Sequence, residues 1–242
     1  SEEFRVKVDE KRMILGMDIS SDIIVVSTGP VISRRGIEEI SCIVFTYSIH
    51  SGELLWSKKI EVLLITPPVI ENEKIWIASG KLDPTFTKTA GGDVICLSTS
   101  DGEEISMTSV EDYAFYGNYL TMSEDILLAQ GLKYDNNSRT QMPPRLFAFS
   151  MATGRQLWEQ DPLDESRMFG TPSIKGNYIY LTENPGFFGS RRRPEAWLMK
   201  LELQTGKLVQ SMNIPQETFG NFSPTLANDA IYINSFTGKI YA

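Results

Sequence analysis

The sequence predicts an all-β protein of the β-propeller type, with about five four-stranded antiparallel blades in tandem. A turn glycine recurs at positions 52, 102, 154 and 206, which are 50, 52 and 52 residues apart. A run of β-forming residues precedes each glycine, and a second, shorter hairpin pattern recurs once in every interval. No helical period accompanies these repeats, so tandem four-stranded units of this length favour propeller blades that bury one another's faces.

The turn glycine marks the end of one strand in each unit. It follows a small residue and lies between two β runs, as in Ser51-Gly52 and Thr153-Gly154. Glycine tolerates the positive φ of a tight antiparallel turn, so we expect a hairpin here between one unit and the next. The strands expected before the turn are Cys42–Ile49, Asp93–Ser98, Arg145–Ser150, Ala196–Leu203 and the start of a fifth at Lys239–Ala242.

The second periodic block is a hairpin of two apolar strands around a polar turn. Turn-forming residues such as Ser21-Asp22 and Lys175-Gly176-Asn177 separate the two strands. The five copies are Met17–Ser27, Pro68–Ser79, Thr121–Ala129, Pro172–Thr182 and Pro224–Asn234. Each unit is therefore expected to be a meander of four strands.

These units are expected to form a single domain over residues 1–242. Their approximate bounds are 1–50, 51–100, 101–152, 153–204 and 205–242. Propellers usually close by mixing strands from both chain ends in one blade, and this phasing leaves no overlapping strand to do so. An alternative is therefore that the chain is a segment of a seven- or eight-bladed ring.

The composition is that of a globular protein with an acidic surface. A net charge of −8 argues against general attraction to nucleic acid, because the far field repels phosphates. The longest apolar runs are far shorter than the roughly 20 residues of a membrane helix, so no membrane span is expected. Cys42 and Cys96 lie at different phases of the repeat, which predicts two buried thiols and no disulfide. No signal peptide is visible.

The segment from Leu146-Phe147-Ala148 through Thr153-Gly154 to Trp158 resembles the pyrroloquinoline-quinone-like repeat. The phasing of all five units follows that repeat, although Ser106 and Gln210 replace the Trp found at Trp56 and Trp158. The resemblance implies that these Trp side chains dock between neighbouring blades. It also implies a protein-interaction scaffold outside the cytoplasm, in the periplasm or cell envelope, similar to the propeller subunit of the outer-membrane barrel assembly machinery.

No catalytic constellation is visible, so we expect no enzymatic activity, cofactor or metal. His50 is the only histidine and lies beside a turn, which excludes His-dependent triads and multi-His metal sites. Quinone-dependent enzymes that share the repeat have larger rings and often an adjacent Cys-Cys pair, which this chain lacks. The resemblance therefore implies the fold more strongly than the chemistry.

Four long loops on one side of the blades are the candidate binding face, since function concentrates on irregular loops of a rigid scaffold. They cover Gly29–Ser41, Gly80–Gly92, Gly131–Arg145 and Asn184–Glu195 and hold ten basic against five acidic residues. Aromatic-Gly segments such as Phe169-Gly170 open on the same side. The candidate binding residues are Arg34, Arg35, Lys88, Tyr134, Arg139, Phe187, Phe188, Arg191, Arg192, Arg193, Phe169 and Phe219.

The function expected from this face is non-catalytic binding of a protein, through an acidic segment, or of a polysaccharide. The bland alternatives are a solvated rim for the basic loops and a structural core for the aromatic-Gly residues. The alternative function is a quinone- or carbohydrate-binding domain of a larger oxidoreductase or sensor.

Overall fold

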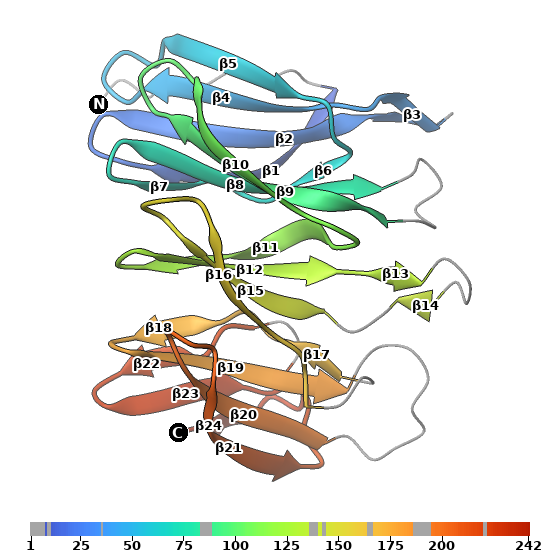
Figure 1. Ribbon diagram of the computed structural model, residues 1–242, viewed down its shortest axis with the longest axis vertical. Helices are drawn as coiled ribbons and strands as arrows, with labels where there is room; N and C mark the ends of the chain where they lie inside the picture. The colour runs from blue at the N-terminus through green and yellow to red at the C-terminus, as the bar shows by residue number, and fades with distance from the viewer. Residues whose placement is uncertain are drawn as a thin grey trace. The chain divides into compact units, whose positions relative to one another are not determined.

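The structure is a computed structural model, and every regular element in the residues that it describes is a β-strand (Figure 1). The described residues are 8, 11–34, 36–82, 89–135, 140–141, 144–163, 167–185, 195–219 and 222–242. They form two compact units, Ser1–Leu120 with Lys133–Thr140 and Thr121–Leu132 with Gln141–Ala242. Within them, the strands form antiparallel meander sheets, which we call blades.

The first unit contains two complete blades. In the first blade the order is β1-β2-β4-β5, and β3 pairs with the far end of β2. In the second blade the order is β6-β8-β9-β10, and β7 also pairs with β8 because Pro67 and Pro68 interrupt the first strand. The bounds are β1 (Arg12–Ile19), β2 (Ile23–Ser33), β3 (Gly36–Glu39), β4 (Cys42–Ser48), β5 (Leu54–Ile60), β6 (Leu64–Ile65), β7 (Val69–Glu71), β8 (Lys74–Leu82), β9 (Thr89–Ser98) and β10 (Glu104–Val110).

The second unit contains most of the third blade and all described strands of the fourth and fifth. The orders are β11-β12-β15-β16, β17-β19-β20-β21 with β18 on β19, and β22-β23-β24; the two remaining strands, β13 of the first unit and β14, pair with each other. The bounds are β11 (Ala114–Ser123), β12 (Ile126–Leu132), β13 (Tyr134–Asp135), β14 (Thr140–Gln141), β15 (Arg145–Ser150), β16 (Gln156–Gln160), β17 (Arg167–Phe169), β18 (Ser173–Lys175), β19 (Tyr178–Pro185), β20 (Glu195–Glu202), β21 (Leu208–Pro215), β22 (Thr225–Ala227), β23 (Ala230–Asn234) and β24 (Ile240–Tyr241). The predicted all-β meander is confirmed.

The turn glycines lie inside the blades, not between them. The strand before each glycine pairs with the strand after it, joining β4 to β5, β9 to β10, β15 to β16 and β20 to β21. The glycines do have the expected positive φ, between 70° and 74°. The expectation of a hairpin between units is therefore wrong in phase, because a period fixes the length of a repeat but not the point where one sheet gives way to the next.

Apolar clusters join successive blades within each unit. In the first unit, one face of β2 and β4 packs against β8 and β9, with Val25, Val44, Ile75 and Ile77 fully buried. In the second unit, a similar cluster joins the third and fourth blades, and a smaller one joins the fourth and fifth. A single meander cannot remove its apolar faces from water, so each blade is stabilised by packing against its neighbours.

Cys42 and Cys96 are buried, unlinked thiols in the first unit, as predicted. Burial raises the pKa of Cys42 to about 12 and that of Cys96 to about 11. Both thiols therefore remain protonated at neutral pH and act as small apolar side chains.

Two Trp side chains connect the outer strand of one blade to the turn of the next, as the resemblance implied. Trp56 on β5 donates its indole N–H to the carbonyl of Thr99 at 2.9 Å, and Trp158 on β16 donates to that of Leu203 at 3.0 Å. The rings lie against the turn glycines: a Cβ on Gly102 or Gly206 would come within 2.7 or 2.5 Å of the ring. The Gly-Trp repeat is thus one interblade contact.

This contact predicts unequal costs for two glycine substitutions. Gly206→Ala should lower the free energy of unfolding by about 2–4 kcal/mol, because a positive φ and a collision with Trp158 act together. Gly238→Ala is the matched control: its φ is +81° with no atom within 4 Å of the new Cβ. It should cost only about 1 kcal/mol in urea unfolding. Equal costs would contradict the contact, and adding Trp158→Ala to Gly206→Ala should give less than the sum of the single effects.

Candidate functional site

Strand pairing continues into segments that were expected to be loops. In the first blade, Ile32 pairs with Ile37 across β2 and β3, and in the second, Lys81 pairs with Gly91 across β8 and β9. The expectation of irregular loops over all of 29–41 and 80–92 is therefore wrong at the stems. Cross-strand pairing of residues such as Ile32 and Ile37 makes the extended backbone favourable there. We call this side of the blades the long-loop face.

The leading aromatic residues of the aromatic-Gly segments, Phe115, Phe169 and Phe219, are core residues. Phe115 and Phe219 are fully buried, and Phe169 is 1% exposed. Phe115 lies so close to the second blade that a Cβ on Gly92 would come within 2.7 Å of its ring. The prediction that Phe169 and Phe219 offer binding contacts is therefore wrong. Both fill the clusters that follow the third and fourth blades.

A buried arginine holds the loop stem of the first blade. Arg12 on β1 donates to the carbonyls of Gly29, at 3.1 Å, and Ser41, at 2.6 Å, which flank the loop. It also forms an ion pair with Glu39 on β3. Because the Arg12 side chain is only 2% exposed, these bonds are shielded from water and fix both ends of the hairpin.

A buried carboxylate has the same role in the second blade. Asp93 on β9 accepts from Ser109 of β10 at 2.7 Å, and it forms an ion pair with Lys81 of β8 at 2.8 Å. Its own N–H donates to the hydroxyl of Ser79. Three strands of the blade thus converge on one carboxylate at the base of the loop.

In the third and fourth blades, polar groups tie the loop stems to the segment that enters the next blade. Gln130, at the end of β12, donates to the carbonyl of Gly170 at 2.7 Å. Asn184, at the end of β19, accepts from the N–H of Phe219 at 2.7 Å. Arg167 donates to the carbonyl of Glu195 at 2.8 Å, which fixes the far end of the fourth loop.

A buried glutamate organises the short turn between β23 and β24. Glu217 is 2% exposed and accepts from Lys239, from Tyr241 at 2.7 Å and from Thr237 at 2.8 Å. These donors, Lys239 first, lower the pKa of Glu217 to about 2. Sequence reasoning missed Glu217, Asp93 and Arg12. For Glu217 the sequence held a signal. A charged residue stands two positions before the buried Phe in both blades, Arg167 before Phe169 and Glu217 before Phe219.

The basic residues of the loops are partly neutralised by carboxylates outside the loops. Lys133 pairs with Asp112 at 2.7 Å, and Arg145 pairs with Glu159 and Asp161, both at 2.6 Å. Lys81 is paired with Asp93 as described. The basic excess counted along the loops therefore overstates the positive charge of the face, since strand and interblade carboxylates lie against it.

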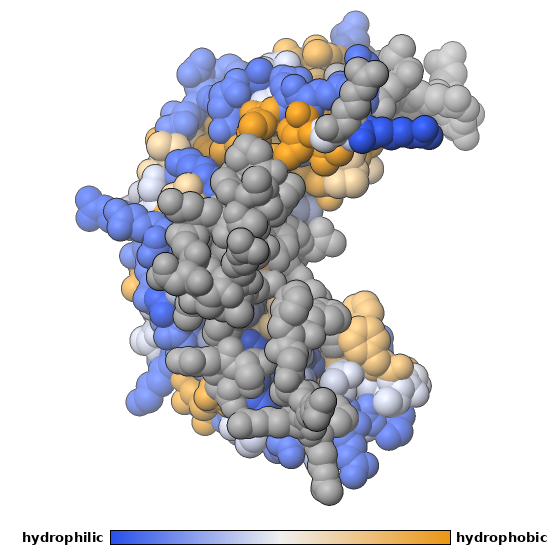
Figure 2. Space-filling model, turned by 90° about the vertical axis from the view of Figure 1, so that its right-hand side faces the viewer, coloured by the Kyte–Doolittle hydropathy of each residue, from blue (hydrophilic) through white to orange (hydrophobic). Residues whose placement is uncertain are grey.

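Few of the predicted binding residues can be placed. Arg34 is exposed beyond the end of β2, and Tyr134 lies on β13. β3 lies on the right of Figure 1, the side that faces the viewer in Figure 2, where hydrophilic residues border an apolar area. The following predicted residues lie outside the described part of the chain: Arg35, Lys88, Arg139, Phe187, Phe188, Arg191, Arg192 and Arg193.

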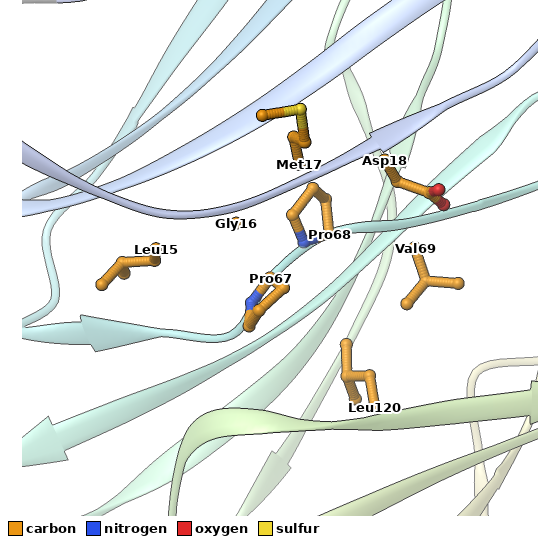
Figure 3. A pocket seen from close by; sticks show the side chains of 8 residues that line it. All are labelled: Leu15, Gly16, Met17, Asp18, Pro67, Pro68, Val69 and Leu120. Atoms are coloured by element: carbon orange, nitrogen blue, oxygen red, sulfur yellow. The ribbon is translucent and has the colours of Figure 1, made fainter. Parts of the chain in front are cut away.

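A pocket of about 460 Å³ opens between the first strands of the first unit (Figure 3). We call it the first-strand pocket. Most of the side chains that line it are apolar, with Asp18 as the one carboxylate, and Gly16 is needed because a Cβ there would lie 2.5 Å from Pro67. The lining residues are Leu15, Gly16, Met17, Asp18, Pro67, Pro68, Val69 and Leu120.

The pocket lies where one blade has an apolar residue at a repeat position that is polar in other blades. At the corresponding position of other blades, a polar side chain bonds to the next first strand: Asp18 accepts from Ile70 N–H at 2.7 Å, and Thr121 donates to the carbonyl of Pro172 at 3.2 Å. In the second blade this position is Val69, which cannot form such a bond. Aligning this position across the repeats was the sequence signal that could have found it.

The described residues contain no group of three or more His, Cys, Asp or Glu side chains placed to bind a metal. His50 is exposed, with its ring 3.4 Å from Asp22, as expected for a turn residue. No helix in the described part of the chain is long and apolar enough to cross a membrane.

Comparison with protein families decides the class of the molecule. The family model described as outer membrane protein assembly factor BamB matches residues 43–242. The chain belongs to this BamB family of PQQ-type β-propeller repeats. The resemblance seen in Thr153-Gly154 and Trp158 is thereby confirmed. No curated protein sequence matches the chain.

Solved structures show the same fold in this BamB-family chain. A quinohemoprotein alcohol dehydrogenase from Pseudomonas putida HK5 is 12% identical with a TM-score of 0.63; the match covers 98% of this chain and 41% of that one. The quinohemoprotein alcohol dehydrogenase from Comamonas testosteroni is also 12% identical, with a TM-score of 0.60; that match covers 96% of this chain and 43% of the dehydrogenase. The computationally designed Ika4 protein is 13% identical, with a TM-score of 0.50 and coverage of 84% and 99%. This chain therefore spans less than half of either dehydrogenase.

The environment of Glu217 predicts a specific pH dependence. Its native pKa of about 2 lies below the ordinary 4.5, so its contribution to stability is complete above that ordinary value and is lost as the pH falls toward 2. Urea unfolding should show the native protein more stable than Glu217→Gln at pH 7. The difference should shrink steadily from about pH 5 to pH 2. A difference that does not change with pH would show that the carboxylate's charge is irrelevant.

Proposed function

We propose that this chain is a non-catalytic, protein-binding scaffold of the cell envelope that works in outer-membrane protein assembly through its long-loop face. One observation carries the proposal: every described blade fastens the base of this face with buried polar contacts. Arg12, Asp93 and Glu217 are examples, each at most 8% exposed. Rigid stems lower the ordering cost of binding, because the loops begin and end at fixed points.

The family supports the partner class. The matching family is described as an outer membrane protein assembly factor, and a factor of that kind acts on or with other proteins. The ion pairs of Lys81, Lys133 and Arg145 weaken the case for a partner held by bulk charge alone. We therefore favour a protein surface of mixed character over a polysaccharide or a purely acidic segment.

The absence of catalysis is part of the proposal. The only histidine, His50, is exposed on a turn, and its ring nitrogen lies 3.4 Å from the carboxylate of Asp22. The raised pKa values of Cys42 and Cys96 leave little thiolate, which is the nucleophilic form of cysteine.

Photocrosslinking from the two ends of one strand tests the proposal. A photoreactive amino acid at Ile32, which is 58% exposed, or at Arg34 probes the long-loop face of the first blade. The same group at His50, beside Asp22, probes the turn end about 30 Å away along β2. We expect discrete protein adducts from Ile32 and Arg34 in envelope preparations and few from His50. Equal labelling from both ends, or adducts to polysaccharide only, would contradict the proposal.

A second candidate function is favoured by the first-strand pocket. Its volume of about 460 Å³ and its apolar side chains can accept a small flat ring, such as a quinone, as part of a larger oxidoreductase or sensor. Purified protein with quinone absorbance that is lost in Val69→Trp would favour this candidate. Protein without such absorbance, and with no change on adding a soluble quinone, would remove it.

A further inference from the structure

The described side chains that line the first-strand pocket can accept hydrogen bonds but donate none. Apart from Gly16, they are leucine, methionine, valine and proline side chains and the one carboxylate of Asp18 (Figure 3). None of these groups carries an N–H or O–H donor at neutral pH. Pro67 and Pro68 also lack the backbone N–H, so this stretch of the wall offers only carbonyls. A polar ligand of such a pocket must therefore supply the donors itself.

In the second unit, a hydroxyl on one first strand bonds to the next first strand at two successive junctions. Thr121 donates to the carbonyl of Pro172 at 3.2 Å, and Ser173 donates to the carbonyl of Pro224. These carbonyls therefore face the preceding blade and are satisfied by it. The repeat gives both junctions the same donor and the same acceptor position.

The first unit lacks this hydroxyl at both corresponding positions. Asp18 and Val69 stand there, and neither can donate, because a carboxylate only accepts and valine has no polar group. The corresponding carbonyls belong to Pro68 and Leu120, and both residues line the pocket. Two carbonyls that the second unit satisfies with a hydroxyl thus receive no bond from this position in the first unit.

Asp18 adds a negative charge that is held in place. Its carboxylate accepts from the N–H of Ile19 at 2.9 Å and from that of Ile70 at 2.7 Å. A carboxylate has about four acceptor sites, so further donors can bind. In the described part of the chain, no lysine or arginine forms an ion pair with Asp18. Figure 3 shows Asp18 and Val69 at one end of the pocket and Leu15 at the other.

We propose that the first-strand pocket receives a lysine side chain of a partner protein, flanked in that protein by apolar residues. A lysine ammonium has three donors on one nitrogen, which matches one carboxylate and two carbonyls on three successive first strands. Its carbon stem and the flanking residues contact Leu15, Met17 and Val69. Arginine fits less well, because the donors of a guanidinium lie in one plane. This contact rests on the proposed protein-binding function but not on the long-loop face.

A short peptide with blocked ends tests the pocket. The probe is acetyl-Leu-Lys-Leu-amide, titrated into the whole chain and followed by amide NMR shifts. We expect saturable binding that weakens with added salt, with the largest shifts at Gly16, Asp18 and Val69. The same peptide with Gln in place of Lys should bind about tenfold more weakly, because it lacks the charge. Equal binding of the two peptides, no saturable binding, or shifts confined to other strands would overturn the proposal.

Two substitutions test the two kinds of acceptor. Asp18→Asn keeps an oxygen for the N–H of Ile70 but removes the charge. The Lys peptide should then bind about tenfold more weakly and lose its advantage over the Gln peptide. Val69→Thr restores the hydroxyl found at Thr121, which should occupy the carbonyl of Leu120 and weaken binding about threefold. Unchanged affinity in either variant would contradict the role given to that acceptor.

A second carboxylate of the same blade provides the matched control. Asp22 is exposed on a turn, 3.4 Å from the ring of His50, and does not line the pocket. Asp22→Asn removes the same charge and should bind the Lys peptide as the native chain does. Equal losses in Asp22→Asn and Asp18→Asn would show a general effect of charge and would overturn the assignment to the pocket.

Failure of this contact can be told apart from failure of the proposed function. If the crosslinks from Ile32 and Arg34 form but the Lys peptide does not bind, the pocket contact alone is excluded. If those crosslinks are absent while the peptide binds and depends on Asp18, the long-loop face alone is excluded. A soluble quinone that binds where the Lys peptide does not would overturn this contact and favour the second candidate function.

Discussion

The contact on which this structure depends is the one between a blade and the next. A four-stranded meander has two faces and cannot remove both from water by itself, so each blade is stable only when a neighbour covers it. The Trp56 and Trp158 rings show how the sequence secures this. Each ring packs on a glycine of the next blade and donates its N–H to a carbonyl of the same turn. A residue with a side chain at that glycine would hold the two blades apart.

The two ends of the strands are built differently. At the turn end the same contacts repeat from blade to blade: the N–H of Gly52, Gly102 and Gly154 returns to a serine carbonyl in each case. At the loop end the contacts differ among the blades, since an arginine, an aspartate and a glutamate each fix one stem and amide side chains fix two others. Repetition at one end preserves the repeat, whereas variation at the other allows each loop to be shaped separately. This contrast is what makes the loop end the better candidate for recognition.

Much of the fold could be predicted from the sequence, because β-formers and turn glycines repeat at a near-constant spacing. Strand β15 was predicted with its observed bounds, Arg145–Ser150. The place of the glycine turn within the blade was not predicted correctly, because such a turn has the same sequence whether it joins two strands of one sheet or two sheets. The site was predicted less well: the sequence left Phe169-Gly170 open between a binding loop and a structural core, and only its burial decides for the core.

Buried polar residues are the hardest class to find in this sequence, because their partners are distant along the chain. Arg12 meets Ser41 and Glu217 meets Tyr241, partners that are 29 and 24 positions apart in the sequence. Nothing local distinguishes Arg12 from a solvated arginine. A repeat position whose side chain is polar in some blades and apolar in another is more informative. Val69 shows this, because Asp18 and Thr121 occupy the same position in other blades.

The electrostatics of the chain argue against treating any one segment by its own charge. Loop lysines such as Lys81 and Lys133 lie 2.7 to 2.8 Å from carboxylates that belong to other segments, so their fields largely cancel beyond a few ångströms. The segment that includes β10 is the opposite case, because its acidic residues outnumber the cations that reach it. With a net charge of −8 overall, a basic partner gains from both the far field and this local cluster. An acidic partner would gain only at short range and would have to displace existing ion pairs. Charge thus favours a partner surface that carries basic residues over an acidic one.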